Sequence, residues 1–311
     1  MKLYLISILL FLFPIISSSQ AWTKPSGEIY AKLFYGSVTA KEQYGFDGTQ
    51  KPMADNVTEN AFFDRSFYLY SEGGLNDEVT IFGSLPYKRV ITRDASFKYS
   101  TFAFGSLMLG GRYKLNNLVG ISGWSDVLSA NLAFTLPTGY TRNFTPSVGA
   151  GQIDAELSLN YGKSFHPLPI YAQAGLGFKY RSSIYALSKS IPCQDGVDKN
   201  CFNDLKPEYG NEITFALNGG YFINDWLLFT LQANGVMSVV KPTEGFSVAN
   251  PIPTKQRYIK LGGGLRVNTY DKLGVSFDAA IIPSGMNIFK GIEVTLGIDY
   301  TFKLWRNKIK F

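Results

Sequence analysis

Two acidic residues two positions apart, Asp154 and Glu156, are the clearest candidates for acid–base chemistry in the sequence. Paired carboxylates can act as general acid and general base when their surroundings separate their pKa values. Here both fall on one face of an alternating stretch, and Arg112 and Arg266 are expected on the same side of the protein. Ion pairing is therefore the favoured interpretation, and no catalytic residue is predicted.

A single histidine, His166, limits other chemistry. Serine hydrolases and histidine-assisted proteases both need an imidazole beside the reacting group. His166 stands between Phe165 and Pro167 in a predicted turn, which favours a turn residue without a chemical role. No metal-site spacing occurs, so the sequence predicts no metal, no cofactor and no enzymatic activity.

The N-terminus has the pattern of a secretory signal peptide. Lys2 precedes an apolar stretch, residues 3–16, and Ser19 and Ala21 occupy the −3 and −1 positions of a cleavage site. We expect three parts: a signal peptide over 1–21, the folded protein over 22–302, and a short basic tail over 303–311. The alternative for the first part is an N-terminal anchor helix.

The two cysteines, Cys193 and Cys201, lie eight residues apart in a polar stretch. In an exported protein, such a pair predicts one local disulfide that fixes a loop.

The composition favours an all-β protein. The chain of 311 residues has 24 Phe, 19 Tyr and 31 Gly, but only 17% charged residues, and its mean hydropathy is near zero. These values exclude a bundle of membrane helices and resemble those of a β-protein in a membrane. The formal net charge of +6 is spread along the chain, so no nucleic-acid partner is expected.

The last expected strand, residues 291–302, shows the alternation most clearly. Its even-numbered positions are all apolar and its odd-numbered positions are polar or glycine, which predicts one apolar and one polar wall. Similar alternation predicts eleven further strands, over residues 28–36, 61–72, 79–88, 102–115, 127–137, 152–165, 170–181, 212–222, 227–240, 257–268 and 273–282.

The connections between these strands alternate in length. Those after odd-numbered strands have about 23, 12, 14, 30, 16 and 9 residues, and the others have about 3–11. Short turns at one end and long loops at the other are typical of outer-membrane barrels. The sequence therefore predicts a 12-stranded antiparallel transmembrane β-barrel in the bacterial outer membrane, with both termini periplasmic. The alternative is a secreted β-sandwich or a soluble barrel.

The polar wall of such a barrel faces the lumen. The predicted lumen-lining residues are Lys32, Asp64, Tyr68, Tyr70, Arg112, Asp154, Glu156, Glu212, Lys260, Arg266 and Glu293. They could tune the selectivity of a channel, or they could form a network that only fills the barrel. The aromatic residues among the inward positions, including Tyr30, Phe34 and Phe82, could line a path for apolar solutes. A register slip of one residue would instead place them in the membrane girdle.

Three stretches carry a family resemblance: AWTKPSG (21–27), LNDEVTIFGSLPY (75–87) and FTLPTG (134–139). They resemble the outer-membrane barrels of the meta-pathway of phenol degradation family, loosely related to transporters of hydrophobic compounds. The resemblance implies a barrel that admits small organic compounds, and it supplies no catalytic residues. About seven residues precede the first expected strand, so the long N-terminal hatch of fatty-acid transporters is not expected.

The end of the last strand resembles the recognition signal of barrel assembly. Gly297, Tyr300 and Phe302 fit its pattern of a glycine followed by two alternate aromatic residues. The expected partners are outer-membrane lipids, the barrel assembly machinery and a small-molecule solute of unknown identity. The expected function is passage of small, hydrophobic or aromatic solutes; the alternative is a structural or secretion-associated barrel with a plugged lumen.

Overall fold

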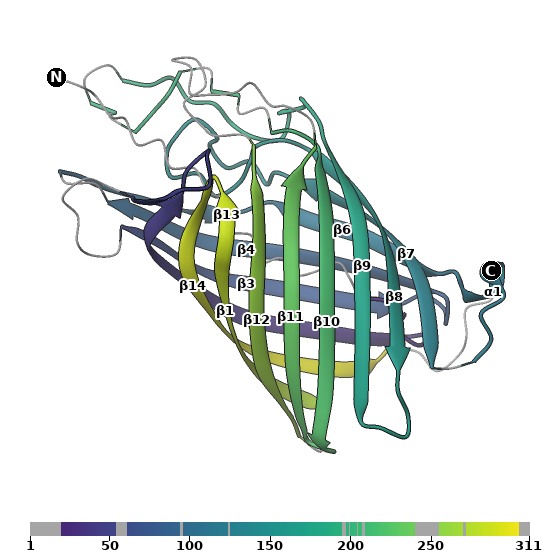
Figure 1. Cartoon of the computed structure of the whole chain (residues 1–311). Coiled ribbons are helices and arrows are strands. Elements are labelled where there is room, and N and C mark those ends of the chain that lie inside the picture. The colour runs from purple at the N-terminus through teal and green to yellow at the C-terminus, as the bar shows by residue number, and fades with distance from the viewer. Residues whose placement is uncertain are drawn as a thin grey trace.

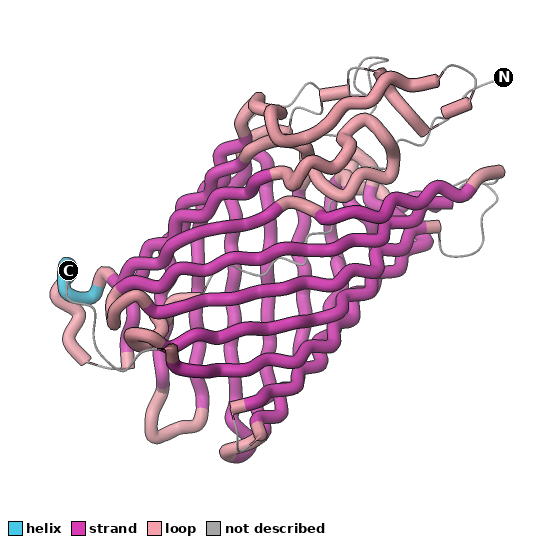
Figure 2. Tube along the Cα trace, turned by 180° about the vertical axis from the view of Figure 1, so that it is seen from behind, coloured by secondary structure: helices cyan, strands magenta, loops and turns pink. Residues whose placement is uncertain are grey.

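The computed structural model describes residues 20–53, 61–93, 96–123, 125–194, 197–198, 200–203, 205–206, 209–239, 255–269 and 272–304. Twelve long strands form an antiparallel sheet that closes into a barrel, which confirms the predicted fold. Figure 1 and Figure 2 show the strands running obliquely around the barrel. Within the described residues, no helix is long and apolar enough to span a membrane.

The barrel strands follow one another around the sheet in chain order. They are β1 (Glu28–Tyr44), β3 (Phe62–Gly74), β4 (Val79–Arg93), β6 (Leu107–Lys114), β7 (Asp126–Leu136), β8 (Asp154–Ser164), β9 (Ile170–Arg181), β10 (Glu212–Asn224), β11 (Leu227–Ser238), β12 (Arg257–Asn268), β13 (Leu273–Met286) and β14 (Ile288–Lys303). Two short strands, β2 (Gln50–Pro52) and β5 (Lys98–Phe104), extend β1 and β4, and a single helical turn, α1, covers Asn116–Val119.

The first and last strands close the barrel. β1 pairs with β14 along its whole length, from Glu28 opposite Lys303 to Tyr44 opposite Ile288, with one irregularity near Ala40. Because a closed sheet has no edge, every strand can satisfy its backbone hydrogen bonds without water, as a lipid environment requires. Lys303, the first residue of the predicted tail, extends β14 by one position.

The two ends of the barrel differ (Figure 1). We call one the loop end, because it carries the connections 137–153, 182–211 and 239–256. The other is the turn end, next to α1, with the short connections 75–78, 165–169 and 225–226. This asymmetry agrees with the predicted pattern of long loops and short turns.

Two of the predicted long loops are wrong. Residues 90–101 were expected to form a charged loop, but β4 continues to Arg93 and pairs with β5 from Lys98 onward. Residues 283–291 were expected to loop back, but β13 and β14 are separated by Asn287 alone, in a left-handed conformation (φ 52°). Similarly, the first strand continues past its predicted end at residue 36 to Tyr44.

The physical reason lies inside the loop end of the barrel. There, inward positions such as Val38, Val90 and Ile282 are apolar and buried, so the polar-inside pattern disappears although the strands continue. A prediction based on alternation therefore ends β1, β4 and β13 too early at this end of the barrel. The predicted signal peptide lies outside the described residues apart from Gln20 and Ala21, and the predicted tail does so apart from Lys303 and Leu304.

Candidate functional site

The inner wall of the barrel carries the predicted lumen residues. On β3, Asp64, Tyr68 and Tyr70 are buried, while Phe67 and Leu69 between them are 54% and 53% exposed on the outer wall. All eleven predicted residues occupy inward positions: Lys32 on β1; Asp64, Tyr68 and Tyr70 on β3; Arg112 on β6; Asp154 and Glu156 on β8; Glu212 on β10; Lys260 and Arg266 on β12; and Glu293 on β14.

A buried ion triad lies near the loop end. Arg181 on β9 donates from Nη1 to Asp154 at 3.2 Å and from Nη2 to both carboxylate oxygens of Glu212, at 2.9 and 2.8 Å. The expectation that Arg112 and Arg266 would pair with the acidic residues of β8 is therefore wrong. Arg181, on the strand next to β8, takes their place, because residues directly opposite each other on neighbouring strands lie closest together.

Glu156 also pairs within its own neighbourhood. It accepts a hydrogen bond from Thr214 Oγ1 at 2.7 Å and lies 3.8 Å from Lys179 Nζ. Further ion pairs join Lys88 to Asp64 at 2.9 Å and Lys260 to Glu293 at 2.7 Å, and Arg266 pairs with Asp299. Charges of both signs thus compensate each other on the inner wall, which suits a network that holds a water-accessible interior in shape.

The inward aromatic residues form a cluster inside the barrel. Phe34, Tyr68, Tyr70 and Phe82 are buried, and Tyr30 packs against them. The rings of Phe34 and Tyr68 are stacked with centroids 4.8 Å apart. The alternative that a register slip would move these residues into the membrane girdle is wrong.

The segment that precedes β1 lies inside the turn end of the barrel. Ala21 is fully buried, and its N–H donates to Gln173 Oε1 on β9 at 3.2 Å. The Trp22 carbonyl accepts a hydrogen bond from Arg112 at 2.8 Å, and its ring meets Tyr171 edge to face at 5.7 Å. The first residues of the predicted short lead-in, Ala21 and Trp22, therefore occupy the lumen.

Two further contacts hold this segment. Lys24 donates from its backbone N–H to Thr80 Oγ1 at 2.7 Å, and its ammonium lies 3.4 Å from Glu72. Gly162 on β8 makes room for the indole, because a Cβ there would approach Trp22 to 2.8 Å. The one signal of this contact in the sequence is a glycine inside a strand, which often marks a close approach of another group.

An apolar layer closes the loop end. The 137–153 connection places Tyr140 and Val148 against inward residues of the strands, among them Phe62, Tyr258 and Phe289. The Tyr140 hydroxyl lies 3.0 Å from Ser106 Oγ and accepts a hydrogen bond from the Gly151 N–H at 2.9 Å. Burial raises the pKa of Tyr140 to about 12.

The 182–211 connection packs onto the 137–153 connection, and we call the two together the lid. The Asn143 side chain donates to the Ile191 carbonyl at 2.7 Å and accepts from the Ile191 N–H at 3.1 Å. Phe144 forms a backbone bridge with Cys201, which is joined to Cys193 by the predicted disulfide. The disulfide therefore fixes the part of the 182–211 connection that contacts the 137–153 connection.

A cavity of about 250 Å³ lies in the lumen, lined by Gln20 of the N-terminal segment and by residues of β1, β3 and β9–β14. Its lining includes the rings of Tyr30, Phe34, Tyr70 and Tyr171, five amides (Gln20, Gln173, Asn218, Gln232 and Asn234) and four charged side chains (Lys32, Lys260, Asp278 and Glu293). Gln173, Asn218 and Gln232 are direct neighbours across β9, β10 and β11. Asn234 is almost fully buried, and its Oδ1 has no hydrogen-bond partner among the described residues. The cavity thus offers ring surfaces and amide groups together.

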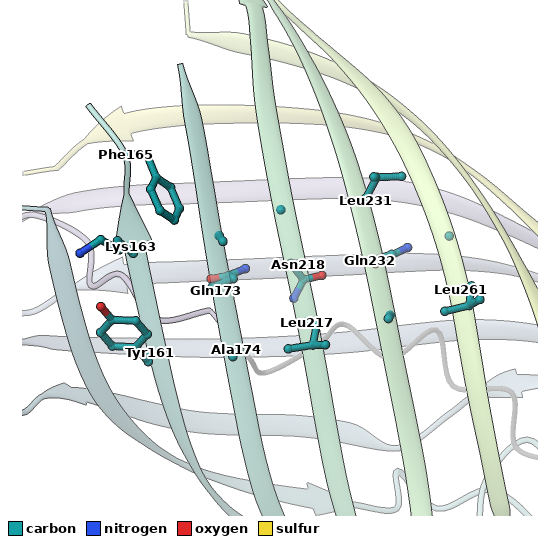
Figure 3. Close-up of a pocket in the computed structure, with 14 residues that line it drawn as sticks. Tyr161, Lys163, Phe165, Gln173, Ala174, Leu217, Asn218, Leu231, Gln232 and Leu261 are labelled. Atoms are coloured by element: carbon teal, nitrogen blue, oxygen red, sulfur yellow. The ribbon is translucent and has the colours of Figure 1, made fainter. Parts of the chain in front are cut away.

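The wall beside this cavity is hollowed. A depression of about 520 Å³ is lined by residues of β8–β12, including the exposed Leu217, Leu231 and Leu261 (Figure 3). Asn218 and Gln232 border both this depression and the cavity. Gly219, which follows Asn218 on β10, borders both as well.

The remaining predicted residues lie away from the cavity. His166 is in the turn between β8 and β9. On β14, Gly297 faces inward, where a Cβ would approach Lys32 Cε to 2.6 Å, while Tyr300 is exposed on the outer wall and its ring centroid lies 6.0 Å from that of Phe302. The described residues contain no group of side chains suited to hold a metal ion.

No protein-family model matches the chain, and no curated protein matches it in sequence. Solved structures do resemble it. A COG4313 outer membrane channel from Pseudomonas putida F1 is 15% identical, with a TM-score of 0.69 over 92% of this chain and 100% of that one. The translocator domain of the autotransporter NalP from Neisseria meningitidis is 12% identical, with a TM-score of 0.53 over 90% of each chain. At these identities the likeness shows the fold, which is that of an outer-membrane β-barrel.

Proposed function

We propose that the protein is an outer-membrane channel that takes up small apolar or aromatic solutes. The observation that carries the proposal is the central cavity, where four aromatic rings line a space of about 250 Å³ together with five amides and four charged side chains. The rings offer apolar contacts to such a solute, and the polar groups can fix its orientation. The likeness to an outer membrane channel supports the same function class.

The orientation follows from the ends of the barrel. Long loops usually face the exterior and short turns the periplasm. We therefore place the lid outside and both termini in the periplasm. The apolar layer beneath the lid then meets the solute first, and this layer opposes the passage of ions because an apolar constriction excludes water.

One specific observation favours a second candidate. Both ends of the lumen are filled, by the lid at one end and by residues 21–24 at the other. A structural or secretion-associated barrel without transport would also have a filled lumen. The two candidates differ in one expectation: only the channel uses the cavity for the uptake of solutes.

Uptake of radiolabelled toluene by intact cells distinguishes them. Expression of the protein should raise the uptake rate above that of cells without it. The variant N218W fills the cavity and should return uptake to the background, while L217W adds the same ring on the outer wall of the same strand and should leave uptake unchanged. Both variants are first checked for heat-modifiable migration on gels, the mark of a folded barrel.

The results decide between the candidates. If N218W leaves uptake unchanged, the solute does not pass through the cavity. Uptake equal to the background for the unaltered protein, together with no conductance in planar bilayers, favours the barrel without transport.

A further inference from the structure

The outer wall changes character where β3, β4 and β5 approach the loop end. Lower on the wall, outward positions carry aromatic residues: the Tyr87 ring lies 4.6 Å from that of Phe102 and 4.8 Å from that of Phe104. Beside and above them, the outward positions carry Arg65, Arg89, Arg93 and Lys98, which we call the outer basic cluster. Aromatic residues on a barrel mark the border between hydrocarbon and headgroups, so the cluster lies at headgroup level.

The register of the strands places like charges directly opposite each other. Arg65 faces Arg89 across β3 and β4, and Arg93 faces Lys98 across β4 and β5. Directly opposed like charges destabilise a sheet. The exposed pair of Arg65 and Arg89 therefore carries a cost in free energy that a bound anion would remove.

Three members of the cluster are not neutralised by carboxylates of the described residues. In the part of the chain that the structure describes, Arg65, Arg89 and Lys98 make no ion pair within 4.0 Å. The contrast with the turn end is direct, because the outward Lys163 there lies 2.9 Å from Asp126. The two ends of the outer wall thus differ in charge.

Two of the guanidinium groups are held in place by one ring. The Cζ atoms of Arg65 and Arg93 lie 5.7 and 5.3 Å from the centroid of Phe63. A cation over an aromatic face is attracted to it without losing its hydrogen-bond donors. Guanidinium groups fixed in this way can donate two parallel hydrogen bonds to a phosphate.

We propose that the outer basic cluster binds the phosphate groups of the glycolipid in the outer leaflet, the phosphorylated lipid A anchor. Because the cluster lies beside the aromatic border, its ligand is a membrane lipid and not a soluble anion. The location at the loop end selects the outer leaflet, and this step rests on the orientation given under the proposed function. Phosphate monoesters on a sugar offer the exposed oxygens that two or more arginines can share.

The test measures binding of purified lipid A to the whole protein in detergent by native mass spectrometry. The probes are bisphosphorylated lipid A, lipid A without phosphates, and phosphatidylglycerol. We expect the unaltered protein to bind bisphosphorylated lipid A most tightly, and R65Q/R89Q to bind it about 10- to 30-fold more weakly. The charge-preserving R65K/R89K should recover part of the loss.

A matched control removes two positive charges from the loop end outside the cluster. The variant K51Q/K189Q changes exposed lysines of the same end and should bind like the unaltered protein. The proposal is overturned if R65Q/R89Q binds as tightly as the unaltered protein, or if lipid A without phosphates or phosphatidylglycerol binds equally well. Because binding in detergent needs no solute, these outcomes are independent of the uptake experiment.

Discussion

Arg112 Nη1 lies 2.8 Å from the Trp22 carbonyl oxygen and 3.2 Å from Oε2 of Glu72. One buried guanidinium thus joins the segment before β1 to the inner wall, and its charge is balanced there by a carboxylate. Arg112 and Glu72 would still form their ion pair if the segment were absent. Removal of the segment therefore leaves no buried charge unpaired.

The first prediction concerns this segment. A chain refolded from Ser26 onward should form the same barrel but show a clearly larger and noisier single-channel conductance than a chain that begins at Trp22. The reason is that the backbone of residues 22–25 blocks the turn end. The variant W22A is the control, because it removes the ring but keeps the backbone in place. Equal conductance of the two chains would mean that the lid alone limits ion flow.

The second prediction concerns the buried triad. R181M leaves Asp154 and Glu212 side by side without their cation, so it should lower the free energy of unfolding by about 3–5 kcal/mol. K179M removes a longer and partly exposed ion pair and should cost less than about 1 kcal/mol. Urea unfolding in lipid vesicles measures both. If R181M is as stable as K179M, protonation or bound water compensates for the loss of the cation beside the two carboxylates.

The third prediction concerns the pH dependence of the lid. Burial raises the pKa of Tyr140 from 10.0 to about 12, so the folded lid favours the neutral phenol. The lid should therefore have its full stability below pH 10 and lose roughly 3 kcal/mol as the pH rises from 10 to about 12. Burial also raises the pKa of Tyr209 in the lid, which acts in the same direction.

Conductance recorded between pH 7 and 12 measures this loss, with openings expected only above pH 10. Y140F removes one of the two titrating groups and should weaken the transition. The same variant deprives the Gly151 N–H of its acceptor, at a cost of about 1–3 kcal/mol. Openings that begin below pH 9 would assign the transition to another group.

The fourth prediction concerns the disulfide. C193S/C201S should leave barrel unfolding nearly unchanged but make the 182–211 connection more sensitive to proteases, because the link closes a loop within the lid. Limited proteolysis of the folded barrel in vesicles measures the difference. If cleavage rates are equal, the hydrogen bonds of Asn143 and Arg142 suffice to hold the lid.

The fifth prediction concerns assembly. Y300A/F302A should lower the yield of folded barrel in cells severalfold, while the variant refolded in detergent should be nearly as stable as the unaltered protein. The control I298A changes an outward residue of the same strand outside the pattern and should assemble normally. An equal loss in both variants would point to strand stability instead of recognition by the assembly machinery.

Much of the fold was predictable because the membrane imposes a simple rule on each strand. Apolar outward and polar inward positions gave β9 (Ile170–Arg181) and β12 (Arg257–Asn268) with their exact limits. The rule fails where the interior is apolar too, as at Val90 and Ile282, because both faces of the strand then look alike. The extensions of β4 and β13 were missed for this reason.

The inward direction of Lys32 and Glu212 was also predictable, but their surroundings were not. Which cation reaches Asp154 depends on the register between β8 and β9, and alternation within one strand does not contain that register. The position of Trp22 in the lumen depends on Gly162, 140 residues away in the chain. Contacts of this kind join residues that are far apart in the sequence, so a pattern within one stretch of the chain cannot predict them.

The position of the N-terminal segment sets an order of events when the barrel forms. Gly27 leads directly into β1, and β1 is joined to β14 by sixteen paired positions. The segment therefore travels with the strand that completes the ring, and it reaches Arg112 and Gln173 on walls that have already formed. A tag fused before Trp22 would have to pass through the same opening.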